Sequence, residues 1–318
     1  MIVEAHKSKQ YLLAIAKVLL LVITFGYIFY KLKSDTKLDF DSFIHSIISK
    51  GVFSIYVFLF LLILAAANWF FEILKWKTLV ATIAKINFKT AQKQALASLT
   101  VSLATPNRIG EYGAKALFFK PENHKKVLLL NFFSGTIQML VTVGFGSFGI
   151  FYLLQNFEIN YSAVGVISLF TIIALVIIIG YYFKEKELFF KGFSLQKIYN
   201  FLKDISLNIK LKTVIFSIFR YLIFSSMFYV LLLFFGAKIS VIEALPIIFA
   251  MYLLVSIFPT FFMFDVVIRG GVAVWLFSLV EIPELIILST VLAMWILNFV
   301  LPAIIGSFYV LTFQPATR

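Results

Sequence analysis

The chain has 318 residues, of which 62% are hydrophobic and 14% are charged. Because a soluble globular domain carries about 25% charged residues, this composition excludes a soluble protein. A net charge of +13 would suggest nucleic acid as the partner of a soluble protein. In a membrane protein the same charge is better explained by orientation and by attraction to anionic lipid. We therefore expect an all-α polytopic membrane protein that does not bind nucleic acid.

Six apolar runs are each long enough to cross a hydrocarbon core of roughly 30 Å. The first is too long for the apolar core of a signal peptide, so we expect it to be retained as an anchor. In chain order the predicted spans are 11–30, 51–74, 127–154, 163–183, 213–235 and 283–313.

Two further apolar stretches are interrupted by proline and glycine, at 92–120 and at 243–280. We interpret each as a re-entrant hairpin of broken helices, and their similarity as a degenerate repeat. The predicted breaks are Pro106, Gly110 and Gly113 in the first hairpin and Pro259, Gly270 and Gly271 in the second.

Charged residues lie in both interrupted stretches, where hydrocarbon would be expected. The first has Arg108, Glu111 and Lys115, and the second has Asp265 and Arg269. Glu111 precedes Lys115 by four residues, and Asp265 precedes Arg269 by four, so each pair lies on one helix face. A charge at mid-membrane costs at least about 2.5–3.5 kcal/mol and is expected to face a partner or a cavity. We predict a hydrated substrate-binding pocket; structural salt bridges without a ligand are the alternative.

The distribution of basic residues predicts the orientation. Eighteen Lys and Arg fall on the side of the N-terminus and five on the opposite side, which places both termini in the cytoplasm. We expect a single membrane domain, 1–318, with halves at about 1–183 and 213–318 in inverted repeat. The basic segment 184–212 links these halves on the cytoplasmic face and contains a surface helix.

For polar residues near the ends of spans we expect structural roles. Glu72 and Arg220 lie close enough to span ends to snorkel. Trp69, Trp76 and Lys75 fit an interface anchor. Four amides within spans can either line the pocket or bond helix to helix: Asn68, Asn131, Gln138 and Asn298.

The chain resembles the transmembrane region of the lysylphosphatidylglycerol synthase family, also called flippase-like membrane proteins. The resemblance rests on Thr105–Gly113 (TPNRIGEYG) and on Ile268–Gly271 (IRGG). It implies movement of an anionic, aminoacylated or polyprenyl-linked lipid between leaflets. The second hairpin departs from the family's pattern, with Phe261, Phe262 and Phe264 where small residues are expected and with Asp265 where Gly or Glu is expected. Because the chain ends at Arg318, we expect no aminoacyl-transfer domain.

Our first hypothesis is a lipid transporter in the cytoplasmic membrane, without enzyme activity. The second is an accessory subunit of an envelope glycosyltransferase or lipid-modifying enzyme, docked through 184–212. The third hypothesis is a membrane-embedded enzyme, whose candidate catalytic acids would be only Glu111 and Asp265. The chain has no cysteine, and its three histidines are scattered, so no metal or other cofactor is expected.

Overall fold

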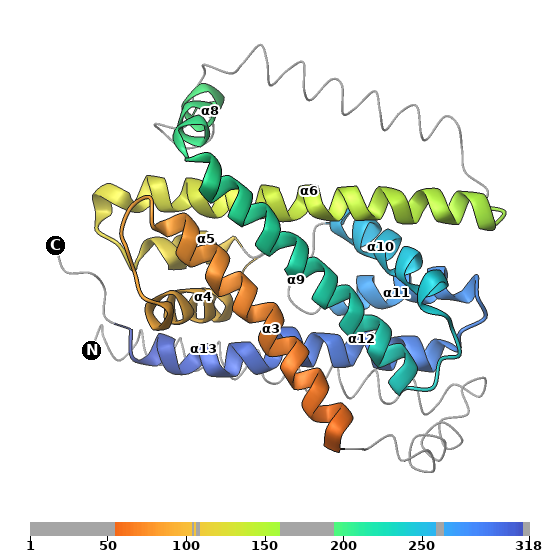
Figure 1. Cartoon of the computed structure of the whole chain (residues 1–318). Helices are drawn as coiled ribbons and strands as arrows, with labels where there is room; N and C mark the ends of the chain where they lie inside the picture. Colours follow the sequence, from red (N-terminus) through yellow and green to blue (C-terminus); the bar gives the residue numbers. More distant parts are fainter. Residues whose placement is uncertain (1–54, 104, 106–108, 160–193, 259–263, 314–318) are drawn as a thin grey trace.

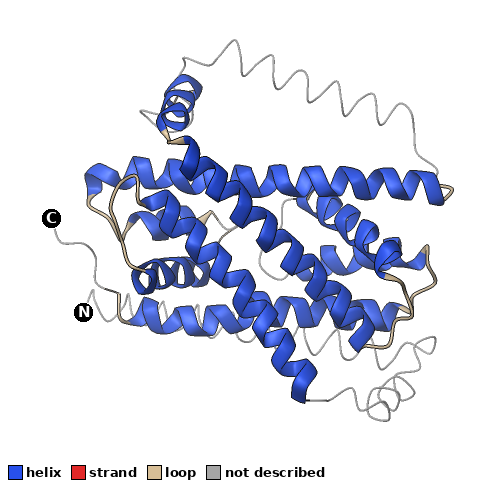
Figure 2. Ribbon diagram, viewed as in Figure 1, coloured by secondary structure: helices blue, strands red, loops and turns tan. Residues whose placement is uncertain are grey.

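The computed structural model describes residues 55–103, 105, 109–159, 194–258 and 264–313. All regular elements in these ranges are helices (Figure 2). In chain order they are α3 (Ile55–Val80), α4 (Phe88–Ser102), α5 (Gly110–Ala116), η2 (Pro121–Asn123), α6 (His124–Asn156), α8 (Leu195–Asp204), α9 (Leu207–Phe234), α10 (Val241–Ile257), α11 (Phe264–Ser278), α12 (Glu284–Trp295), the π-helix η3 (Ile296–Val300) and α13 (Leu301–Leu311).

Four helical segments of the described ranges are long and apolar enough to cross a membrane: Ile55–Val80, Pro121–Asn156, Leu207–Phe234 and Glu284–Leu311. They coincide with four of the predicted spans, those at 51–74, 127–154, 213–235 and 283–313. The predicted spans 11–30 and 163–183 lie outside the described residues. An integral membrane protein built from helices is therefore confirmed, and six spans remain a prediction.

The helices form a frame with one interrupted stretch at each end (Figure 1). The long helix α6 runs along one edge, and the continuous α12–η3–α13 runs along the other. Between these edges, α4 and α5 lie toward one end and α10 and α11 toward the other, while α3 and α9 cross the frame together. This arrangement separates the two interrupted stretches in space.

Each interrupted stretch contains two helices that pack on each other, α4 with α5 and α10 with α11. Gly110 is the first residue of α5, and its amide donates to Thr105 Oγ1 at 2.8 Å. A Cβ at Gly110 would lie 2.8 Å from the same hydroxyl oxygen, so this break requires glycine. Pro106 and Pro259 lie outside the described residues.

Three of the predicted breaks are wrong. Gly113 lies inside α5, and Gly270 and Gly271 lie inside α11. A glycine costs a helix only about 1 kcal/mol relative to alanine, and tertiary packing readily offsets that cost. Glycine alone was therefore a weak indicator of a break.

Glycine has a different function where α6 crosses α10. A Cβ at Gly149 would collide with the backbone of α10 at Pro246 O and Ala250 N, and one at Gly146 would meet the Leu253 side chain. Small residues therefore let these two helices approach closely. Gly144 lies in the same helix, but a Cβ there would meet nothing within 4 Å.

The described part of the basic linker contains α8, the expected short helix. The side chain of Ser194 accepts the Lys197 amide and caps its N-terminus. None of its residues is buried, and Leu195 and Tyr199 are exposed. The helix lies against α6 (Figure 1), where Phe201 and Leu202 pack on an apolar cluster.

The two α6 glycines provide a matched test of the close helix approach. We expect Gly149→Ala to lower the free energy of unfolding by about 1–3 kcal/mol, the usual cost of overpacking. Gly144→Ala in the same helix should leave stability unchanged or raise it by up to about 1 kcal/mol through helix propensity. Denaturant unfolding in lipid–detergent micelles measures both. Equal effects of the two substitutions would contradict the packing of α6 against α10.

Candidate functional site: a cation-rich cavity and a separate arginine pocket

A buried ion cluster joins α3 to α9. Glu72 and Lys75 are one turn apart on α3, so they share a face, and Lys75 Nζ lies 2.9 Å from Glu72 Oε2. The same oxygen lies 3.0 Å from Nη1 of Arg220 on α9. Lys75 Nζ also donates to Gln138 Oε1 at 3.4 Å, which connects the cluster to α6. One carboxylate thus holds two cations from different helices.

A second ion pair lies beside it on α5. Lys115 Nζ donates to Glu111 Oε1 at 2.8 Å, so the predicted pairing at a four-residue spacing is confirmed. It also donates to Asn131 Oδ1 of α6 at 2.8 Å and lies 4.4 Å from the ring centroid of Trp76. These contacts satisfy an ammonium group whose side chain is only 1% exposed, as burial of a charge requires.

The two ion pairs border one cavity between α3, α4, α5 and α9. Its lining residues are Trp69, Glu72, Ala95, Glu111 and Arg220. We call this space the cation-rich cavity, because the surrounding side chains include three cations, Lys75, Lys115 and Arg220, against the carboxylates of Glu72 and Glu111.

Exposure shows which charges face this cavity. The side chains of Glu111 and Arg220 are 21% and 23% exposed, whereas those of Lys75 and Lys115 are 2% and 1% exposed. The two lysines therefore lie behind the surface that a ligand would touch. Arg220 also has a buried Nε without a hydrogen-bond partner in the described part of the chain. Among the described residues, the accessible cation of the cavity is Arg220.

The structure corrects the interpretation of several residues near span ends. Trp69, Trp76 and Lys75 are buried inside the protein, not placed at an interface, and Trp76 Nε1 donates to Gln94 Oε1 at 2.8 Å. Glu72 is buried as well. Arg220 extends to Glu72, so it does not snorkel.

The π-helix η3 contacts Trp69 of the cavity lining. Pro302 lacks the N–H that would bond the Asn298 carbonyl in an α-helix. Trp69 Nε1 donates to that carbonyl instead, at 3.1 Å, and Asn68 Nδ2 donates to Asn298 Oδ1 at 2.8 Å. All four span amides therefore bond helix to helix, since Asn131 accepts from Lys115 of α5 and Gln138 donates to Ser217 O of α9.

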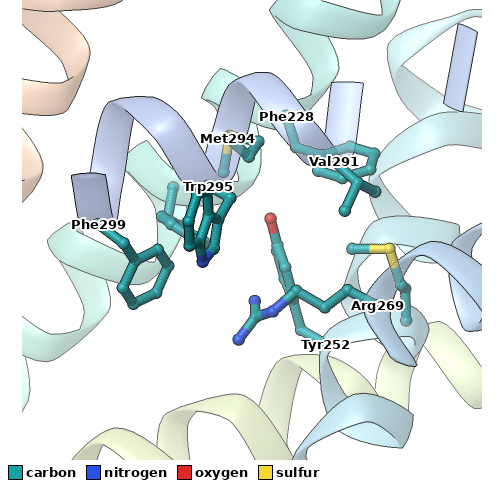
Figure 3. A pocket seen from close by; sticks show the side chains of 9 residues that line it. Phe228, Tyr252, Arg269, Val291, Met294, Trp295 and Phe299 are labelled. Carbon is teal, nitrogen blue, oxygen red and sulfur yellow. The ribbon is translucent and has the colours of Figure 1, made fainter. Parts of the chain in front are cut away.

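Arg269 lies in a different pocket, between α9, α10, α11 and α12–η3 (Figure 3). We call this the arginine pocket; its lining residues are Phe224, Phe228, Met251, Tyr252, Arg269, Val291, Met294, Trp295 and Phe299. It shares no lining residue with the cation-rich cavity. The expectation of one pocket that holds Glu111, Lys115 and Arg269 together is therefore wrong for the described residues.

The other two predicted site residues cannot be placed. Arg108 lies outside the described residues, as does the side chain of Asp265, so its pairing with Arg269 remains a prediction. Within the described ranges, no group of three His, Asp or Glu side chains is arranged to hold a metal ion.

The sequence contained a signal for the ion cluster that was missed. Asn68, Glu72 and Lys75 recur at helical spacing on α3 together with the buried Leu61 and Ala65. Polar residues that follow the same period as buried ones lie on the inner face of a helix, and this pattern argues against snorkelling.

The Glu72–Lys75 pair generates a stability prediction. Glu72→Gln leaves Lys75 buried beside Arg220, and we expect it to lower the free energy of unfolding by about 3–5 kcal/mol, as when one partner of a buried pair is removed. Adding Lys75→Met should restore part of the loss, because the unpaired buried ammonium is then gone. The exposed Glu122→Gln is the control, with an expected change within about 0.5 kcal/mol. Additive losses in the double variant, measured by denaturant unfolding, would contradict the pairing.

Comparison with known proteins identifies the family. The family model described as "Lysylphosphatidylglycerol synthase TM region" matches residues 12–306. Comparisons with curated proteins and with solved structures give no match. Since the family match covers nearly the whole chain, including both interrupted stretches, the protein belongs to the lysylphosphatidylglycerol synthase transmembrane-region family.

Proposed function

We propose that the protein moves a lipid with an anionic head group between the leaflets of the cytoplasmic membrane. One observation carries this proposal: three cations and two carboxylates surround a cavity beside α3 and α9, which are both long enough to span a membrane. With all five groups charged, the set has an excess of one positive charge, which an anion would neutralise. Membership of the family supports a role in lipid metabolism or transport.

In this proposal Arg220 makes the main contact with the head group. A guanidinium presents a planar fork of N–H donors that matches a phosphate or carboxylate. In Arg220, Glu72 engages Nη1, and the side chain keeps 23% of its surface exposed. An incoming oxyanion can therefore add to Arg220 without removing Glu72. Arg108 remains a predicted second base.

Glu111 determines what else the cavity accepts. Its carboxylate faces the cavity and binds Lys115. An aminoacylated lipid carries an ammonium group beside its phosphate, and Glu111 can accept hydrogen bonds from that ammonium. The cavity thus has complementary groups for an anionic lipid and for an aminoacylated one. The phosphate of a polyprenyl-linked lipid would bind the same Arg220 side chain.

Transport follows if the head group crosses the protein while the lipid tails stay in the bilayer. The helix pairs α4–α5 and α10–α11 lie toward opposite ends of the frame (Figure 1). We propose that they are re-entrant hairpins of inverted repeats, with both chain termini in the cytoplasm. Opening of one pair at a time would give the head group access from one leaflet and then the other.

Lipid scrambling in reconstituted vesicles tests the proposal. We expect Arg220→Gln to slow transbilayer movement of fluorescent phosphatidylglycerol about tenfold or more, because a hydrogen bond to a charged group contributes about 1.5–3 kcal/mol. Arg220→Lys keeps the charge but loses the fork, so its rate should be intermediate. Dithionite quenching of the outer leaflet measures both rates.

The control for this experiment is Lys126→Gln, which removes an exposed cation from the start of α6. Its rate should equal that of the wild type. Wild-type scrambling by a folded Arg220→Gln variant would refute the proposal. Scrambling that requires a co-purified enzyme would favour the accessory-subunit hypothesis instead.

A further inference from the structure

The arginine pocket contains a buried hydroxyl without a partner. Tyr252 is only 8% exposed. Its Oη neither donates nor accepts a hydrogen bond within the described part of the chain. Figure 3 shows Tyr252 and Arg269 side by side in this pocket, with the hydroxyl directed toward α12 and the guanidinium toward the Phe299 ring, 5.9 Å from its centroid. A buried polar group left without a partner costs about 1–3 kcal/mol, which indicates that something else satisfies it.

The chemistry of the pocket lining indicates the kind of ligand. Arg269 offers only N–H donors, and Tyr252 adds an O–H donor. The remaining lining side chains are aromatic or aliphatic, or belong to Met251 and Met294. Two neighbouring hydrogen-bond donors within an apolar wall match an oxyanion attached to an apolar body. Methionine side chains are flexible, so this wall can adjust to a ligand.

The pocket is next to the cation-rich cavity. Arg220 lines the cavity and Phe224 lines the pocket, and residues four apart on α9 are about one helical turn from each other. Trp69 of the cavity and Phe299 of the pocket belong to one apolar cluster. The two spaces are therefore separated by a thin partition, made of these rings and the Asn68–Asn298 hydrogen bond.

The partition includes a π-helix, since Asn298 and Phe299 both lie in η3. Single π-turns within α-helices occur frequently at functional sites. The Trp69 indole is held there by one hydrogen bond to the Asn298 carbonyl. Rotation of the rings after that bond opens would connect the two spaces.

We propose that the arginine pocket is a second oxyanion site, in which Arg269 and Tyr252 bind the phosphate group of an amphiphile. This inference rests on the proposed transport function and adds a second binding site for the head group. The head group would pass from Arg220 to Arg269 across the Trp69–Phe299 partition. The aromatic wall then contacts the apolar part of the same ligand.

The tryptophan residues allow ligand binding in the cation-rich cavity and in the arginine pocket to be observed separately. Of the four in the chain, Trp69 lines the cavity, Trp295 lines the pocket, and Trp275 is 50% exposed and lines neither. Labelling with 5-fluorotryptophan gives each residue a ¹⁹F resonance without changing the charge. Phosphatidylglycerol, phosphatidylcholine and inorganic phosphate are each titrated into the protein in neutral detergent micelles.

We expect phosphatidylglycerol to shift the Trp295 resonance in a saturable way. Arg269→Gln should weaken this titration about tenfold or more, and Tyr252→Phe about fivefold, as expected for loss of a charged and of a neutral hydrogen bond. Tyr229→Phe removes a hydroxyl that donates to Ile239 O outside both pockets and should have no effect. A comparable Arg269-dependent shift with inorganic phosphate would support the site and assign it to free phosphate.

A shift of Trp69 without Trp295 would overturn the second site and leave the proposed transport function intact. A Trp295 shift that persists unchanged in Arg269→Gln, or that phosphatidylcholine produces equally, would also overturn it. Loss of scrambling in Arg220→Gln is measured independently, so failure of the proposed function is distinguishable from failure of this inference.

Discussion

The structure depends on one carboxylate, that of Glu72, which holds Lys75 and Arg220 together between α3 and α9. Charges removed from water are tolerated only when they are paired and hydrogen-bonded. Here the pairing fixes two membrane-length helices against each other and keeps one guanidinium at the edge of a cavity. The same interaction that stabilises the helix pair therefore also positions the group that would contact an anion.

Other contacts serve to bring polar groups close to this pair. Gly149 lets α6 approach α10, and a Cβ at Gly306 would collide with α4 at Leu96 O and Thr100 Oγ1. Stacking of Phe71 on Phe219, with ring centroids 5.2 Å apart, adds an apolar contact between α3 and α9 beside the ions. In a bilayer such packing drives helix association, because burial of apolar side chains contributes little there. Small residues at helix crossings thus allow the close packing of the frame that holds the ion cluster.

Much of the frame could be predicted from the sequence, because span length and hydropathy are local properties. The Glu111–Lys115 pair was also predictable, since a four-residue spacing on a helix fixes it. The cavity itself was not, because Glu72 and Arg220 are distant in sequence and meet only through the packing of α3 on α9. The expected grouping of Arg269 with Glu111 and Lys115 in one pocket failed for the same reason. An internal sequence repeat predicts that two stretches form similar helices. It does not predict whether the side chains of the two stretches meet in one pocket.

The most direct test of this account is an experimental density map of the protein in nanodiscs that contain phosphatidylglycerol. We expect density for a phosphate group in the cation-rich cavity, in contact with the Arg220 guanidinium, with Glu72 still bound to Arg220 and Lys75. A map in which lipid lies only on the outer surface, and in which apolar side chains fill the space between Glu111 and Arg220, would contradict it.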